Sequence, residues 1–153
     1  MKLVNSAQDR FVFHLSRREK DLLLTVTRLY PRITSPRQPL SKKGDLPECE
    51  ASQRLLDEAL AEHRAEAQKQ AQTLLADPSR LGQHETGWRL SLSRPDLEML
   101  LQVLNEIRVG SWVLLGSPED HHHPALNAET APHLWAMELA GGFEMALLQA
   151  MGG

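Results

Sequence analysis

The sequence predicts a mainly α-helical domain of about four helices packed as a bundle, with a minor two-stranded β ribbon. Four segments repeat apolar residues at intervals of three and four, which is typical of helices with one buried side. Residues 11–15 and 88–92 instead alternate apolar with polar side chains, which is typical of short strands. A chain of 153 residues is the size of one domain, so we expect residues 1–153 to fold as a single unit.

The first strand is expected to lead directly into a helix. Ser16 and Glu19 have the spacing of a capping box, in which each side chain binds the other residue's backbone N–H. Pro31 ends this helix because a proline disfavours helical geometry in the residue before it. Residues 31–47 contain four prolines and several basic side chains, and we expect a Pro-rich basic loop there.

A long surface helix is expected next. Residues 48–76 consist mostly of Ala, Glu, Gln, Arg and Leu, which are strong helix formers. The apolar stripe of this segment is made largely of alanine, so its burial contributes little free energy. The helix therefore belongs on the surface, and Asp77 and Pro78 end it.

The second half repeats the pattern of a strand followed by a capped helix. Ser93 and Asp96 form a second capping box after residues 88–92. The helix that comes next is apolar over much of its circumference and is expected to be central, ending at 116–118. Residues 117–129 form a His-rich loop. The last helix, to about Met151, is apolar or small on nearly every side, and we expect it to be buried in the core or against another subunit.

The two halves share an internal echo at an offset of 77 residues. Phe11 to Glu19 and Trp88 to Asp96 both have the order aromatic, any, apolar, any, Leu, Ser, Arg, any, acid. Two explanations stand beside each other. Either the unit was duplicated or reached twice by convergence, or two common local patterns coincide. In both cases we expect the two strands to pair, because a single short strand is marginally stable.

Composition excludes several classes of protein. One cysteine, Cys49, leaves neither an intramolecular disulfide nor a multi-cysteine zinc site. Residues 1–10 hold no apolar run of secretory length, and no charge-free stretch reaches 18 apolar residues, so we expect a cytoplasmic protein without a membrane span. No Gly-rich phosphate loop or nucleophile elbow occurs, and the favoured interpretation is a protein without enzymatic activity and without a cofactor.

The run His121, His122 and His123 favours one alternative, a divalent metal site. Imidazole is a common ligand of zinc, nickel and copper. Consecutive side chains point apart, so the site also needs a ligand from elsewhere, such as His133 or Glu129. The first alternative function is therefore a metal-binding protein or a metal-dependent enzyme. The opposing interpretation is a solvated loop that binds metals only adventitiously.

Charge is divided unevenly along the chain. Residues 1–47 carry ten basic and four acidic side chains, whereas the remainder carries seven and sixteen. The third alternative is accordingly a nucleic-acid-binding regulator that uses the basic N-terminal third. The overall net charge of −3 and the scarcity of stacking aromatics there make nucleic acid an unfavoured partner. The favoured interpretation is that the basic loop faces Glu58, Glu62 and Glu66 of the long helix.

Arg108 is the most informative polar residue, because it lies on the apolar stripe of the central helix, where an unpaired charge is costly. Glu138 and Glu144 interrupt the apolar last helix. We expect Arg108 to pair with one of them or with a partner's carboxylate. Glycine is unfavourable inside helices. Gly110 is therefore predicted to cross Gly141 closely, and the alternative is that Gly141 and Gly142 break the last helix.

The central helix contains the run Leu104, Asn105, Glu106, Ile107 and Arg108, and Trp135 lies on the last helix. These residues resemble the signature of an uncharacterised bacterial family, the domain of unknown function 2017. The order of segments is also similar. The family carries no established activity or catalytic residues. Its genes often lie beside that of a proteolytic adaptor in actinobacteria, and by association the resemblance implies a regulatory or protein-handling role.

The favoured function is a cytoplasmic module that binds a protein partner or forms a homo-oligomer. The last helix is too apolar for its position, and this is the main reason for the prediction. The predicted structural and interaction residues are Asn105, Arg108, Gly110, Trp112, Trp135, Glu138, Gly141, Gly142 and Glu144.

Overall fold

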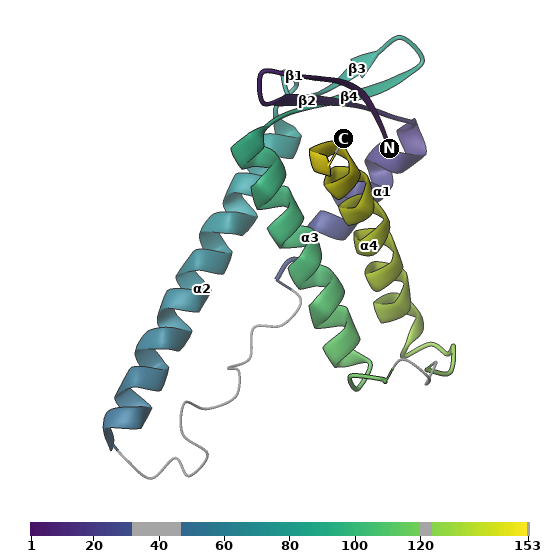
Figure 1. The fold of residues 1–153 in the computed structure, drawn as a ribbon. Helices are drawn as coiled ribbons and strands as arrows, with labels where there is room; N and C mark the ends of the chain where they lie inside the picture. Colours follow the sequence, from purple (N-terminus) through teal and green to yellow (C-terminus); the bar gives the residue numbers. More distant parts are fainter. Residues whose placement is uncertain (32–46, 120–123, 153) are drawn as a thin grey trace.

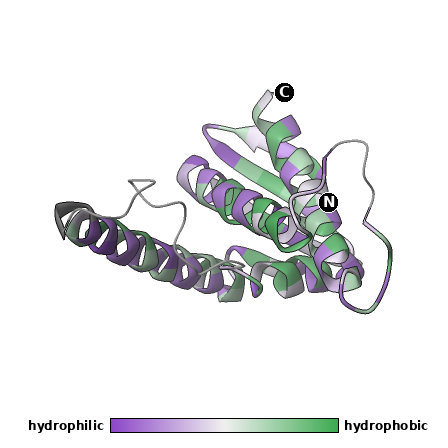
Figure 2. Ribbon diagram, turned by 90° about the horizontal axis from the view of Figure 1, so that it is seen from below, coloured by the Kyte–Doolittle hydropathy of each residue, from purple (hydrophilic) through white to green (hydrophobic). Residues whose placement is uncertain are grey.

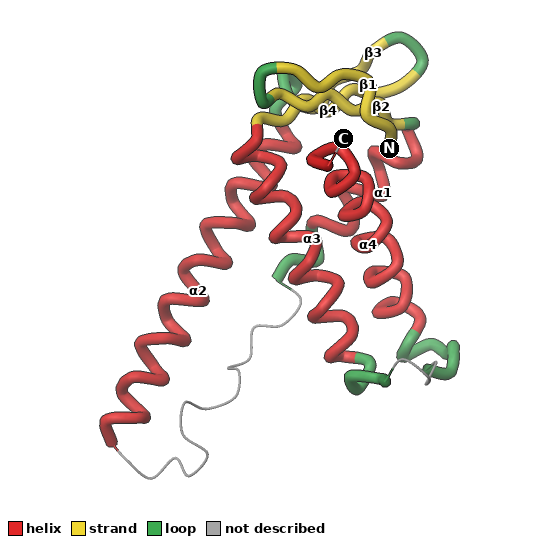
Figure 3. The backbone as a smooth tube through the Cα atoms, in the orientation of Figure 1, coloured by secondary structure: helices red, strands yellow, loops and turns green. Residues whose placement is uncertain are grey.

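A computed structural model describes residues 1–31, 47–119 and 124–152 (Figure 1). In chain order its elements are β1 (Lys2–Ala7), β2 (Arg10–Leu15), α1 (Arg17–Thr27), α2 (Pro47–Ala76), β3 (Leu81–His84), β4 (Gly87–Ser93), α3 (Arg94–Leu114) and α4 (Ala131–Gly152). The strands form one layer across one end of the helices, and all helices lie on the same side of it (Figures 1 and 3). Within the described ranges, no helix is both long and apolar enough to cross a bilayer.

The sheet corrects the prediction of a two-stranded ribbon. It has four antiparallel strands in the order β1–β2–β4–β3, and the two predicted strands are its central pair. The prediction was wrong because the edge strands carry little apolar alternation. In β1 only Leu3 is even half-buried, and in β3 only Leu81 is buried. The fold is therefore mainly helical with a complete small sheet.

The central strands pair about a local two-fold axis at Phe13 and Leu90, which lie opposite each other. The offset of 77 residues relates Phe11 to Trp88 and Leu15 to Leu92. The pair Phe11–Leu92 therefore corresponds to the pair Trp88–Leu15, and both pairs are present. The two hairpins have matching ends as well, since Ala7 pairs with Arg10 and His84 with Gly87. The internal echo is thus a structural repeat of a hairpin followed by a helix.

Both repeats begin their helix with the predicted capping box. The Ser16 hydroxyl accepts a hydrogen bond from Glu19 N, and the Glu19 carboxylate accepts one from Ser16 N. Ser93 and Asp96 make the same two bonds. Each box satisfies backbone N–H groups that the first turn of a helix leaves free, so each strand turns into its helix at a fixed point.

The core lies between the sheet and the helices, with α3 at its centre. The sheet contributes Phe11, Phe13, Leu15, Leu90 and Leu92, all buried. The α4 helix buries one side only, and these residues are Ala136, Ala140, Phe143, Leu147 and Ala150. Of the two predicted surroundings of this helix, the core therefore covers one side, and burial of the other side against another subunit stays a prediction.

The α2 helix packs only through its last turns. Ala67, Ala71, Leu74 and Leu75 are buried there, whereas Leu55 is 67% exposed near the other end. The first half of the helix diverges from α3 and projects from the body (Figure 1). Most of its turns are hydrophilic, in contrast to α3 and α4 (Figure 2). This arrangement agrees with the expected surface helix.

Candidate interaction surface

Arg108 connects α3 and α4 through a polar network. Its Nε donates to Glu144 Oε2 at 2.9 Å, and its second terminal nitrogen donates to Asn105 Oδ1 at 2.8 Å. The pairing with one of the two α4 carboxylates is as predicted. The Glu144 side chain is only 12% exposed, whereas Arg108 is 46% exposed. The guanidinium therefore lies at the surface above the helix contact and not inside the core.

This network lies in the middle of a surface on which polar and apolar side chains alternate. Residues on α3 at spacings of four, three and four share one stripe, and so do residues on α4 at the same spacings. The Arg108–Glu144 pair places the two stripes side by side. We call this surface the hairpin face, and define it as Leu101, Asn105, Arg108 and Trp112 of α3 with Met137, Gly141, Glu144 and Leu148 of α4.

Two large side chains of the hairpin face extend into solvent. Trp112 is 40% exposed and Leu148 is 55% exposed. The Trp112 indole N–H donates to the Pro118 carbonyl at 3.0 Å, so the ring is held in one orientation. An ordered aromatic ring loses little further entropy on binding, and Trp is over-represented among the residues that dominate interfaces.

The exposed apolar residues gather on this part of the molecule. Eight of the eleven large exposed hydrophobic side chains in the described ranges lie on α3, α4 or their connection. They are Val109, Trp112, Val113, Leu114, Leu126, Trp135, Met145 and Leu148. Two of these eight, Trp112 and Leu148, belong to the hairpin face. The sequence predicted an apolar last helix in the core or against another subunit, but it did not single out Met145 or Leu148 as exposed.

The predicted roles of the α4 glycines are not supported. A Cβ built on Gly141 meets the Arg108 Cδ at 3.6 Å, an ordinary contact, and no other atom within 4 Å. A Cβ on Gly142 meets nothing within 4 Å. Gly141 therefore makes room beside the Arg108 side chain rather than for the backbone of Gly110, which is itself buried. The helix also continues unbroken through both glycines.

The remaining predicted residues lie apart from the network. Glu138 and Trp135 are exposed on α4, and His133 is half-buried near its start. His121, His122 and His123 lie outside the described residues. Among the residues that are described, no group of three or more His, Cys, Asp or Glu side chains is arranged to hold a metal ion. The metal site stays a prediction.

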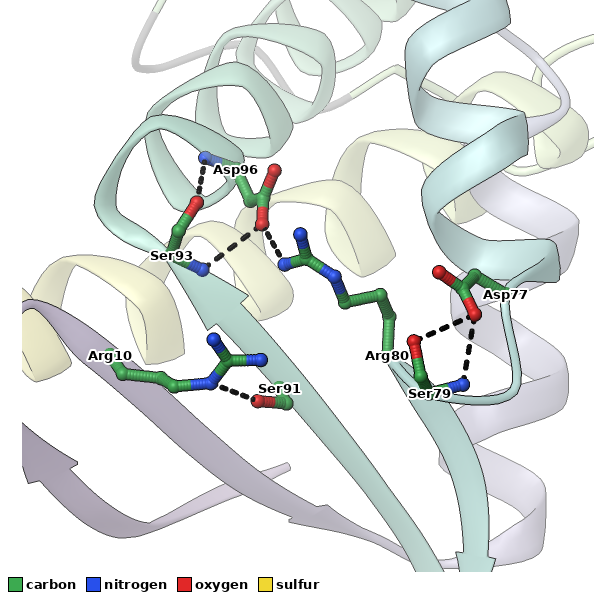
Figure 4. Close-up of polar contacts among 7 residues, drawn as sticks. All are labelled: Arg10, Asp77, Ser79, Arg80, Ser91, Ser93 and Asp96. Carbon is green, nitrogen blue, oxygen red and sulfur yellow. Dashed lines mark hydrogen bonds and ion pairs between the residues drawn. The ribbon is translucent and has the colours of Figure 1, made fainter.

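A recess lies where the end of α2 meets the start of α3. It has a volume of about 530 Å³ and is lined by both acidic and basic side chains. Arg80 reaches across it to the Asp96 carboxylate of the second capping box (Figure 4). The Asp77 carboxylate accepts hydrogen bonds from the Ser79 N–H and hydroxyl. Sequence reasoning missed Arg80 because no motif connects it to Asp96.

The electrostatics of this recess favour a structural role. Partial burial by itself raises the pKa of Asp96, but hydrogen bonds from Ser93 and the charge of Arg80 outweigh it, so this pKa lies below the ordinary value. Hydrogen bonds from Ser79 likewise lower the pKa of Asp77. Both carboxylates are held ionised and already paired, whereas a general acid near neutral pH needs a raised pKa.

Comparison of the chain with protein-family models, with curated proteins and with solved structures gives no match.

Proposed function

We propose that this chain is a cytoplasmic protein-interaction module that associates with a second copy of itself through the hairpin face. The observation that supports the proposal is that two exposed apolar side chains, Trp112 and Leu148, share a face with one ordered ion pair on two packed helices. Large apolar patches of this kind are uncommon on monomeric proteins. The resemblance of residues 104–108 to the domain of unknown function 2017 family is compatible with such a regulatory role.

The composition of the hairpin face suits protein binding. Trp, Met and Arg are the residue types enriched at the centres of interfaces, and Trp112, Met137 and Arg108 supply one of each. Arg108 uses two of its five N–H donors within the chain. We expect the other donors to bind a carboxylate on the partner.

The chain offers such a carboxylate itself. Glu138 is exposed on α4 at the edge of the hairpin face, about 9 Å along the helix before Glu144 and about 120° around it. It makes no ion pair in the described part of the chain. A two-fold axis between Arg108 and Glu138 brings each guanidinium toward the Glu138 of the other copy. Two antiparallel helix pairs brought together in this way form a four-helix bundle, a common way to bury such faces.

A charged residue on the hairpin face should abolish self-association. Leu148→Glu places a carboxylate in the hairpin face, and the matched control, Leu55→Glu, alters a leucine on α2 that is also more than half exposed. Sedimentation equilibrium should show a dissociation constant raised at least 100-fold by Leu148→Glu and unchanged by Leu55→Glu. Circular dichroism checks that both variants fold. Equal effects of the two variants would contradict the assignment of the surface.

A charge exchange tests whether the partner is a second copy. Arg108→Glu and Glu138→Arg should each weaken self-association, because each places like charges opposite one another in the dimer. Mixing the two variants restores both opposite-charge pairs, so the mixture should form a heterodimer that neither variant forms alone. A mixture that remains monomeric would contradict the proposal that the hairpin face binds a second copy of the chain.

A further inference from the structure

The sheet has one face that no helix covers. All four helices lie on one side of it, and the opposite side is open (Figures 1 and 3). Side chains alternate between the two sides of a strand. Because Phe11, Phe13 and Leu15 are buried toward the helices, Arg10, Val12 and His14 point to the open side. The same alternation along β4 sends Arg89, Ser91 and Ser93 to the open side.

Basic residues meet on this open side in one row across three strands. Lys2 of β1 lies opposite His14 of β2, and His14 lies opposite Arg89 of β4. Directly opposite side chains on neighbouring strands are about 5 Å apart at their Cβ atoms. Arg10 adds a further cation, and its Nε donates to Ser91 Oγ at 3.0 Å (Figure 4). We call Lys2, Arg10, His14 and Arg89 the basic row.

The fold does not neutralise the basic row. Neither Lys2, Arg10 nor Arg89 makes an ion pair within residues 1–31, 47–119 and 124–152, and no outward strand position there carries an acid. Acids in the hairpin turns are engaged elsewhere, since Asp9 pairs with Arg94 and Glu85 lies beside His84, and Glu19 of α1 pairs with the Met1 ammonium. An anionic ligand is the arrangement's natural complement.

We propose that the open sheet face binds the phosphate backbone of double-stranded nucleic acid without sequence preference. Isolated exposed cations bind one anion weakly, whereas a polyanion that meets several of them gains free energy by releasing its counterions. Asn5 and Ser91 lie in the adjacent row and add the amide and hydroxyl groups that commonly contact phosphates.

Two features favour this ligand over others. No Phe, Tyr or Trp occupies an outward position on the described strands, so the large stacking platform typical of single-strand binders is missing. The face also lacks the apolar and aromatic centre of a protein interface, since its apolar members are limited to Val4, Ala7 and Val12. The sequence disfavoured nucleic acid from the overall net charge of −3, but the relevant quantity is the charge of one face.

Fluorescence anisotropy with a labelled 20-bp DNA duplex tests the proposal across a series of salt concentrations. Lys2, Arg10 and Arg89 supply three permanent charges, so the slope of log K against log salt should be about −2.7. Arg89→Gln and Lys2→Gln should each weaken binding and reduce the slope by about 0.9. The matched control is Arg54→Gln on the exposed side of α2, which should change neither quantity.

Three outcomes would overturn the proposal. The first is no change in anisotropy at low salt with protein at millimolar concentration. The second is an equal loss of binding in Arg54→Gln and Arg89→Gln, which would indicate only diffuse attraction. The third is equally good competition by polyglutamate of matched charge, which would assign the face to acidic proteins.

Discussion

The two repeats begin alike and end differently. Both contain a hairpin, a capped helix start and the same central register. However, α1 has 11 residues and α3 has 21. Only α3 packs along an antiparallel neighbour, α4, and that pair carries the hairpin face. The comparison teaches that short local signals specify the repeated unit, whereas the length and apolarity of the helices after each hairpin decide which repeat has an open surface.

The largest predicted effect is at the axis that relates the repeats. Phe13 and Leu90 are fully buried and face each other. Phe13→Ala should lower the free energy of unfolding by about 3–5 kcal/mol and Leu90→Ala by about 2–5 kcal/mol, because each leaves a cavity. Urea unfolding measures both losses. Since the two side chains lie opposite each other, the double variant should depart from additivity. Losses below about 1 kcal/mol would contradict a shared core at this axis.

Two glycines, one in the sheet and one in α4, should respond in opposite ways to substitution by alanine. A Cβ on Gly82 lies 2.6 Å from the Pro78 carbonyl oxygen, which belongs to the backbone and yields little. Gly82→Ala should therefore destabilise the fold by about 1–3 kcal/mol. Gly142→Ala meets no atom and should stabilise it by about 0.5–1 kcal/mol through helix propensity. Thermal unfolding should move in opposite directions for the two variants, and a common direction would refute this prediction.

The two capping boxes allow a matched test of the repeats. Ser16→Ala and Ser93→Ala should each cost about 1 kcal/mol of stability. Each box carboxylate also holds a cation, since Glu19 pairs with the Met1 ammonium and Asp96 with Arg80. The loss for Ser93→Ala should be the larger, because the Asp96 side chain is 22% exposed and the Glu19 side chain 37% exposed. Chemical unfolding of the two variants decides the order, and a larger loss for Ser16→Ala would contradict this effect of burial.

Acidification offers a smaller effect of known sign. The folded-state pKa of Asp96 lies below its ordinary value of 3.8. Its stabilising contribution is therefore complete above that value and disappears as the pH falls through the folded pKa. Asp96→Asn should be less stable at pH 7 but should lose less stability between pH 5 and 2 than the unaltered chain, as measured by urea unfolding. An identical pH dependence would contradict the role of this carboxylate.

Sequence predicted those elements that carry strong local signals. Both capping boxes, both central strands and the pairing of Arg108 with an α4 carboxylate could be inferred from residue spacing and burial. The edge strands escaped prediction because edge strands bury few side chains and so lose their alternation. The row of Lys2, His14 and Arg89 could not be found for the same reason, since it depends on the register of an unpredicted strand.

The mass of the metal-stripped chain in solution tests the central proposal most directly. Size-exclusion chromatography with light scattering should give a mass twice the 17.2 kDa of one chain, independent of added zinc. A monomer at every concentration would contradict self-association through the hairpin face. Dimers that form only with zinc would indicate that the chains associate through the histidine-rich loop.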